Sequence, residues 1–222
     1  MAKPEKIFII RHGESEGNVS KEIYLKKPDY SLNLTENGKA QIKDVGCLLR
    51  SIIEYSWGLE PVWIYSSPFY RARQTTAILK DHLKVLKVIE DVRLREQEWN
   101  NNNLREDGEM RDSQEIRDRI GSFYYRFEGG ENVADCWDRI SGFLDTFWRD
   151  FEKVDFPRFV IISGHGMINR VLVARWLHYT VEEFETLRNP KNGQFYTLVQ
   201  QKNGKYTLSE PPEKYPAPTR QY

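Results

Sequence analysis

Ile7-Phe8-Ile9-Ile10-Arg11-His12-Gly13 indicates the fold class of this chain. Its four apolar residues, three of them β-branched, predict a short strand buried on both faces, as in a parallel sheet. A guanidinium, an imidazole and a glycine follow the strand directly. Because open α/β sheets bind ligands beyond the carboxyl ends of their strands, this junction is the first candidate for a functional site.

Signals for strands and helices alternate along the rest of the chain. Thr35 is suited to cap a helix over residues 35–55. The expected apolar stripe of that helix is Val45, Leu48, Leu49, Ile52 and Ile53. Further strands are expected at residues 62–65, 85–89, 159–163, 194–200 and 206–209, and further helices at 69–83, 110–125, 133–151 and 167–178. This alternation predicts an α/β fold, a mostly parallel sheet sandwiched between helices.

Length and composition predict how the chain is organised. The 222 residues, 39% of them hydrophobic, suit one catalytic domain over residues 1–210. The prolines from Pro211 onward predict an irregular tail over residues 211–222. Lysine plus arginine equals aspartate plus glutamate at 33 each, so no net field recruits nucleic acid or a membrane. A local cluster of cations is therefore needed to bind any anion.

The cysteines and the apolar segments predict the compartment. Cys47 and Cys136 are too few for a disulfide framework and too far apart in sequence for a zinc ligand pair. They indicate a reducing environment. The first ten residues lack the features of a signal peptide, and no apolar run has the roughly 18 residues of a membrane span. We expect a cytoplasmic protein without a bound metal.

Three predicted strand ends carry unusual chemistry. They are Arg11-His12-Gly13, the segment from Ser66-Ser67-Pro68 to Arg71, and Gly164-His165-Gly166. Taken singly, each has an ordinary interpretation as a surface pair, a solvated helix face or a turn. Together they bring cations to one edge of the sheet, where imidazole can accept a phosphoryl group and guanidinium can bind two of its oxygens.

These residues stand in blocks that resemble the signature of the histidine phosphatase, or phosphoglycerate mutase-like, superfamily. In chain order, the blocks are residues 10–15 with Asn18, residues 34–38, residues 66–68 with Arg71-Ala72 and Gln74-Thr75, residues 94–96, and residues 163–166. They follow the family order from about residue 6 to 170, and the combination is highly specific. Residues 123–127, Glu131, residues 134–135 and residues 189–193 further resemble the fungal and plant branch of broad-range phosphatases.

The resemblance implies a phosphoglycerate mutase-like fold and a metal-independent phosphomonoester hydrolase that needs no cofactor. His12 is implied to be the nucleophile, which forms a phosphohistidine, and Glu96 the proton donor and later acceptor. The catalytic and phosphoryl-binding groups are implied to include Arg11, Asn18, Arg71, His165 and Gly166. The implied partner is a small-molecule phosphomonoester, whose identity the sequence leaves open along with the oligomeric state.

Physical chemistry agrees with these implied roles. Phosphoryl transfer depends on in-line positioning and on neutralising negative charge, which two guanidiniums and an imidazolium supply without a metal ion. His12 must be neutral to attack, whereas His165 works best as a cation. We therefore expect the surroundings to separate the pKa values of the two side chains, ordinarily about 6.5.

Two other functions compete with hydrolysis. A cofactor-dependent phosphoglycerate mutase would share the pocket but hold a second anionic group. Mutases of the family carry a long insertion with adjacent basic residues, whereas the corresponding interval here has no Arg-Arg pair. A non-catalytic scaffold that binds a phosphorylated ligand is disfavoured because all five implied catalytic residues are present. They are Arg11, His12, Arg71, Glu96 and His165. We therefore predict a phosphatase.

The segment around the predicted acid–base residue leaves two points open. Glu98 is a rival to Glu96 as the proton donor, and Glu14 is more suited to orienting other groups. Residues 99–102, Trp-Asn-Asn-Asn, replace a glycine that is common in relatives soon after the glutamate. Because asparagine tolerates left-handed backbone conformations, we expect the turn to survive.

Overall fold

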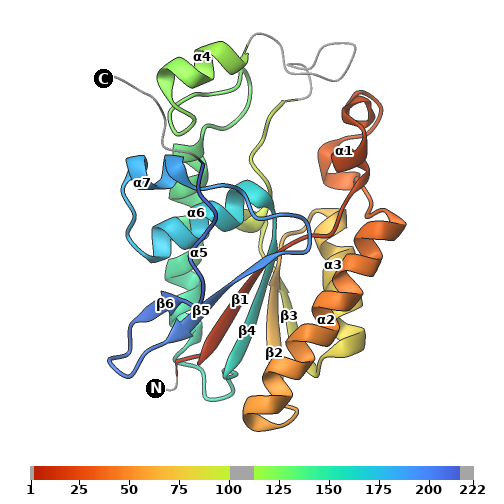
Figure 1. Ribbon diagram of the computed structural model, residues 1–222, viewed down its shortest axis with the longest axis vertical. Helices are drawn as coiled ribbons and strands as arrows, with labels where there is room; N and C mark the ends of the chain where they lie inside the picture. Colours follow the sequence, from red (N-terminus) through yellow and green to blue (C-terminus); the bar gives the residue numbers. More distant parts are fainter. Residues whose placement is uncertain (1–2, 101–112, 216–222) are drawn as a thin grey trace.

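The computed structural model describes residues 3–100 and 113–215, within which a six-stranded sheet forms the centre (Figure 1). Its strand order is β3-β2-β4-β1-β5-β6. The strands are β1 (Lys6–Arg11), β2 (Val62–Ser66), β3 (Val85–Glu90), β4 (Phe159–Gly164), β5 (Phe195–Gln200) and β6 (Tyr206–Leu208). The first four in this order pair in parallel, and β5 and β6 join antiparallel. The predicted, mostly parallel α/β sheet is confirmed.

Helices cover both faces of the sheet. Helices α2 and α3 lie on one face, and α5 and α6 lie on the other (Figure 1). The α-helices are α1 (Glu16–Val19), α2 (Glu36–Trp57), α3 (Tyr70–His82), α4 (Ser113–Ile120), α5 (Val133–Asp150), α6 (Gly166–Trp176) and α7 (Val181–Thr186). Short 3-10 helices are η1 (Lys21–Leu25), η2 (Asp29–Ser31) and η3 (Val92–Leu94).

The core consists of two layers, one on each face of the sheet. Successive residues of β1 alternate between them, with Ile7 and Ile9 against α5 and α6, and Phe8 and Ile10 against α2. All four are completely buried, and burial of each side chain contributes roughly 1.5–3 kcal/mol. This double burial explains why the strand reads as a continuous apolar run.

Two details of the predicted helices are wrong. Leu48 is 50% exposed, because the buried stripe of α2 runs through Ile42, Val45, Leu49 and Ile53, at helical spacing that leaves Leu48 to one side. The helix expected over residues 110–125 ends at Ile120, where Gly121 has a φ of 97° that stops it. The first residues of that segment lie outside the described residues.

The first part of the predicted irregular tail is attached to the domain. Residues 211–215 form no helix or strand, but the backbone N–H of Tyr215 donates to Thr186, and that of Arg188 donates to Glu213. An isolated bridge joins Leu187 and Lys214. The rest of the predicted tail lies outside the described residues.

The parallel register brings three strand ends to the same height. Arg11 of β1 pairs with Gly164 of β4, and Ser66 of β2 pairs with Ser163 beside it. The segments that begin with His12, Ser67 and His165 therefore leave the sheet at one edge. The convergence predicted from the sequence is present.

The start of α2 packs tightly against the loop that follows β1. Thr35 caps the helix by accepting from the Gly38 N–H, as predicted, and the Thr35 N–H donates to the Glu14 carbonyl. A Cβ on Gly38 would lie 2.0 Å from the Glu14 carbonyl oxygen, and one on Gly13 would lie 2.2 Å from the Gly38 carbonyl oxygen. Two glycines are therefore required for this close backbone contact.

Substitution by alanine should have opposite effects on stability at two helical glycines, because only Gly38 lies in this close backbone contact. Gly38→Ala should lower the free energy of unfolding by about 1–3 kcal/mol, because backbone atoms must move apart. Gly142→Ala in α5 should raise it by about 0.5–1 kcal/mol, because its added Cβ meets only a side-chain nitrogen at 3.9 Å and alanine favours the helix. Urea unfolding measures both, and a Gly38→Ala protein as stable as the parent would contradict the predicted clash.

Candidate active site

His12 lies buried at the end of β1 with its two ring nitrogens in different roles. Nδ1 lies 2.6 Å from the Gly13 carbonyl oxygen, which can only accept, so Nδ1 carries the proton. Nε2 then has a free electron pair, to which Arg71 Nε–H donates at 3.1 Å. This tautomer presents Nε2 as the nucleophilic atom.

Arg71 projects from the first turn of α3, directly after the segment that leaves β2. Its side chain is 4% exposed, and its guanidinium forms an ion pair with Asp29 of η2. Nη1 lies 2.9 Å from Asp29 Oδ1 and Nη2 lies 3.3 Å from Oδ2. Its cation also lies over the ring of Phe69, 5.1 Å from the centroid.

Arg11 reaches the same region from the end of β1. Its Nη1 donates to the Pro190 carbonyl at 2.6 Å, whereas its buried Nε has no hydrogen-bond partner among the described residues. A Cβ on Gly166 would lie 3.4 Å from Arg11 Nε, so Gly166 lets the start of α6 approach the guanidinium. Burial is the main cause of the lowered pKa of Arg11. Its unpartnered Nε–H can donate to an anion.

His165 is completely buried at the end of β4, beside His12. The two ring centroids are 5.2 Å apart. His165 Nε2 lies 2.7 Å from the hydroxyl oxygen of Ser67, and its ring packs edge-on against Phe69 at 5.2 Å. Its Nδ1 has no hydrogen-bond partner among the described residues. The sheet edge therefore brings together four of the residues predicted from the sequence, Arg11, His12, Arg71 and His165.

The electrostatic surroundings of the two histidines are nearly alike. Burial, and then the charges of Arg71 and Arg11, lower the pKa of His12 well below its ordinary value. Burial, Arg71, His12 and Arg11 likewise lower the pKa of His165. These surroundings favour the neutral form of both imidazoles, including that of His165, for which a cation was expected. An incoming phosphoryl dianion would raise the pKa values of both histidines.

Glu96 follows η3, and its carboxyl group is held by backbone donors. The N–H of Gln97 donates to Oε1 at 3.0 Å, and that of Met167, in the first turn of α6, donates to Oε2 at 3.4 Å. Burial raises the pKa of Glu96, although Arg71 and Arg11 oppose that rise. A carboxyl group with a raised pKa close to two phosphate-binding cations is suited to general acid catalysis.

Glu98, the rival carboxylate, lies in a different environment. It is exposed, and its Oε1 accepts from the backbone N–H of Asn100 at 3.1 Å. Asn100 itself has a φ of 53°, so the expectation that asparagine would keep the left-handed turn is confirmed. Geometry and burial both favour Glu96 over Glu98.

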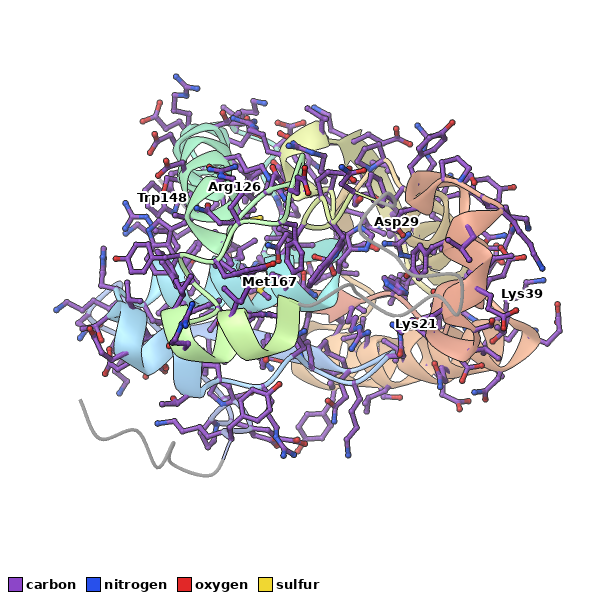
Figure 2. The ribbon with its side chains drawn as sticks, turned by 90° about the horizontal axis from the view of Figure 1, so that it is seen from above. Lys21, Asp29, Lys39, Arg126, Trp148 and Met167 are labelled. Atoms are coloured by element: carbon purple, nitrogen blue, oxygen red, sulfur yellow. The ribbon has the colours of Figure 1, made fainter. Side chains whose placement is uncertain are left out.

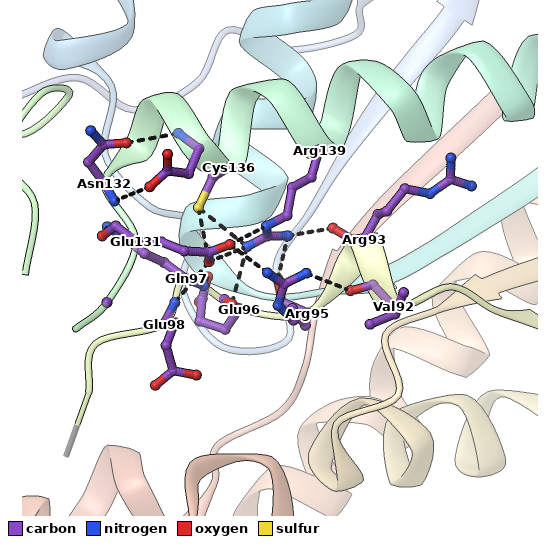
Figure 3. Close-up of polar contacts among 12 residues, drawn as sticks. Val92, Arg93, Arg95, Glu96, Gln97, Glu98, Glu131, Asn132, Cys136 and Arg139 are labelled. Carbon is purple, nitrogen blue, oxygen red and sulfur yellow. Dashed lines mark hydrogen bonds and ion pairs between the residues drawn. The ribbon is translucent and has the colours of Figure 1, made fainter.

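A polar network on α5 fixes the segment that carries Glu96 (Figure 3). Arg139 pairs through Nε and Nη2 with both carboxylate oxygens of Glu131 at 3.0 Å, and also donates to the carbonyls of Arg93, Arg95 and Glu96. Glu131 accepts in addition from Arg95 Nη2 at 2.6 Å. One partly buried ion pair thus holds most of the loop backbone around Glu96.

Asn18 lies at the rim of the site. Its Oδ1 accepts from the Ser15 N–H at 3.0 Å and from Asn192 Nδ2 at 3.0 Å. Asn192 Nδ2 also lies 3.2 Å from the His12 carbonyl oxygen. With its oxygen held in this way, the Asn18 side chain directs its NH₂ group away from these donors. It can therefore act as a donor to an anion.

A protein-family model matches nearly the whole chain. Residues 7–210 match the model of the histidine phosphatase superfamily, branch 1. The chain belongs to the histidine phosphatase superfamily. Enzymes of this family hydrolyse phosphoesters without a metal ion, typically through a phosphohistidine, and this chain is a phosphatase of that kind.

Its relatives carry the names of phosphatases and mutase-like proteins. The phosphoglycerate mutase-like protein AT74 of Arabidopsis thaliana is 36% identical over 93% of this chain and 68% of its own. The broad-range acid phosphatase DET1 of Saccharomyces cerevisiae is 26% identical over 86% of this chain and 84% of its own. A mycobacterial glucosyl-3-phosphoglycerate phosphatase has a similar fold, with a TM-score of 0.68 and 20% identity over 94% of this chain and 99% of its own.

The structure adds residues that the sequence did not single out for this phosphatase. Asp29 and the Ser67 hydroxyl contact the site directly, and Asn192 supports the His12 loop. Ser67 and Asn192 stand within blocks that resemble the family, but Asp29 lies in a 3-10 helix without periodicity. In residues 3–100 and 113–215, no cluster of three or more potential metal ligands is found, and no helix is long and apolar enough to cross a membrane.

Removal of the Arg139 charge from the network on α5 should reduce both stability and activity. Arg139→Gln should lower the free energy of unfolding by about 3 kcal/mol, because Glu131 is left as a poorly exposed carboxylate without its main partner. It should also lower kcat/KM, because the Glu96 segment loosens. Arg149→Gln on the same helix is the control and should change stability by less than about 0.5 kcal/mol. Equal effects of the two substitutions, in denaturant unfolding and steady-state assays, would contradict this assignment.

Proposed function

We propose that this phosphatase hydrolyses small phosphomonoesters with His12 Nε2 as the nucleophile. The hydrogen bond from Nδ1–H to the Gly13 carbonyl carries the proposal, because it leaves the other nitrogen ready to attack in a site lined by two guanidiniums. Arg11, Arg71, His165, Asn18 and Gly166 bind the phosphoryl group or let it approach. We further propose a single catalytic domain over residues 1–210 in a cytoplasmic protein without a nucleic-acid or membrane partner.

In the first step, Nε2 of His12 forms a bond to phosphorus, and the ester oxygen leaves with its electron pair. Glu96 gives its proton to that oxygen, so the alcohol departs neutral. In the second step, Glu96 takes a proton from water, which attacks the phosphohistidine and releases inorganic phosphate. The guanidiniums neutralise the charge that spreads over the phosphoryl oxygens in both steps.

Covalent labelling tests the nucleophile. Rapid quenching of the wild-type protein with a ³²P-labelled phosphomonoester should trap a base-stable, acid-labile label. His12→Ala should lose the label and turnover while keeping its circular dichroism spectrum and its cooperative unfolding. A label on a serine or an aspartate in the wild-type protein would show that the assignment of His12 is wrong.

Substrates with different leaving groups test Glu96. Glu96→Gln should slow the hydrolysis of alkyl phosphates by about two to four orders of magnitude, because glutamine cannot supply a proton. An aryl phosphate needs little protonation, so its first step stays fast in Glu96→Gln and attack by water limits turnover. Stopped-flow absorbance should then show a burst of phenol. For alkyl phosphates, the wild-type kcat/KM should also fall as the pH rises through the raised pKa of Glu96.

Glu98→Gln is the matched control for this experiment. It removes a carboxylate two residues away that is exposed and bonded to the backbone of Asn100. It should show neither the burst nor the loss with alkyl phosphates. A burst in Glu98→Gln and ordinary kinetics in Glu96→Gln would transfer the role to Glu98.

A further inference from the structure

The guanidinium of Arg71 already has an anion in contact with it. Asp29 accepts from Nη1 through its backbone carbonyl at 2.7 Å, and its two carboxylate oxygens lie 2.9 Å from Nη1 and 3.3 Å from Nη2. Nε donates to His12. Three of the five N–H groups of this guanidinium thus donate hydrogen bonds to protein acceptors, which leaves two for phosphoryl oxygens.

Asp29 approaches the site from a segment outside the sheet. It lies in η2, between α1 and α2 in the chain, and to the right of Met167 of α6 in Figure 2. Its side chain is 17% exposed, so its charge is only partly screened by water. Its influence extends to Glu96, whose pKa is raised mainly by burial, while the charge of Asp29 acts in the same direction.

We propose that Asp29 is a specificity-determining residue that selects phosphomonoesters whose leaving group carries no second negative charge. The phosphoryl group of any substrate competes with the Asp29 carboxylate for the N–H groups of the Arg71 guanidinium. A leaving group with its own carboxylate then meets Asp29 at the mouth of the site and is repelled, whereas an alcohol or an amine is not. The proposal rests on the phosphatase activity proposed above.

The same contact weakens the binding of the product. Inorganic phosphate must compete for Arg71 with the Asp29 carboxylate. That carboxylate belongs to the same chain and is always next to the guanidinium. An internal competitor of this kind lowers affinity for free phosphate without removing the cation that the transition state requires. Asp29 therefore favours product release as well as discrimination between substrates.

A matched pair of substrates tests the proposal. Racemic glycerol 3-phosphate and racemic 3-phosphoglycerate differ only in a hydroxymethyl group against a carboxylate. Asp29→Asn should raise the ratio of kcat/KM for 3-phosphoglycerate to that for glycerol 3-phosphate about tenfold, because one charge repulsion is removed. Calorimetric titration should show tighter binding of inorganic phosphate by about three- to tenfold. Glu22→Gln, which removes an exposed carboxylate from η1 in the same segment, should change neither.

The alternative is that Asp29 only holds Arg71 in place. In that case Asp29→Asn would lower kcat/KM for both substrates by the same factor and weaken phosphate binding, which would overturn the proposal. An unchanged substrate ratio would overturn it as well. Asp29→Ser is the second variant should Asp29→Asn fail to fold. If the wild-type protein bound phosphate but formed no label on His12, the proposed function would fail, while phosphate titration of the variants would still test Asp29.

Discussion

The crowding of cationic groups at one edge of the sheet is the constraint on which the rest of the site depends. The parallel register of β1, β2 and β4 forces Arg11, Arg71 and two histidines into a space largely closed to water. Desolvation and mutual repulsion make this arrangement costly. These effects favour the neutral form of both imidazoles. Each guanidinium also has a partner, Asp29 for Arg71 and the Pro190 carbonyl for Arg11. A phosphoryl dianion relieves the remaining imbalance.

The two histidines differ in their hydrogen-bond partners rather than in their burial. The Gly13 carbonyl can only accept, so it keeps the proton of His12 on Nδ1 and leaves Nε2 with its electron pair. The partner of His165 is the Ser67 hydroxyl, which can donate to a neutral ring or accept from a charged one. His165 can therefore gain a proton when an anion arrives without losing its contact. The asymmetry that the chemistry needs is set by these two oxygens.

Features that depend on the backbone alone could be predicted from the sequence. Short apolar runs define buried strands, and a parallel sheet must bring their carboxyl ends together, so the convergence of His12, Arg71 and His165 followed. The left-handed turn at Asn100 followed from the conformational tolerance of asparagine. The contact of Asp29 could not be predicted, because a short 3-10 helix has no periodic pattern and its position depends on long-range packing. The shared low pKa of the histidines likewise depends on burial that no local motif encodes.

The two acidic residues beside the cations also differ in their contacts. Asp29 forms an ion pair with Arg71, whereas the described contacts of the Glu96 carboxyl group are backbone N–H donors. Burial therefore dominates for Glu96 and raises its pKa, as its proposed role as proton donor requires. When the alcohol has left, the Glu96 carboxylate lies close to Arg11 and Arg71, whose charges stabilise it until it takes a proton from water. In the proposed mechanism, the cations that bind the phosphoryl group thus also affect the change of Glu96 from acid to base.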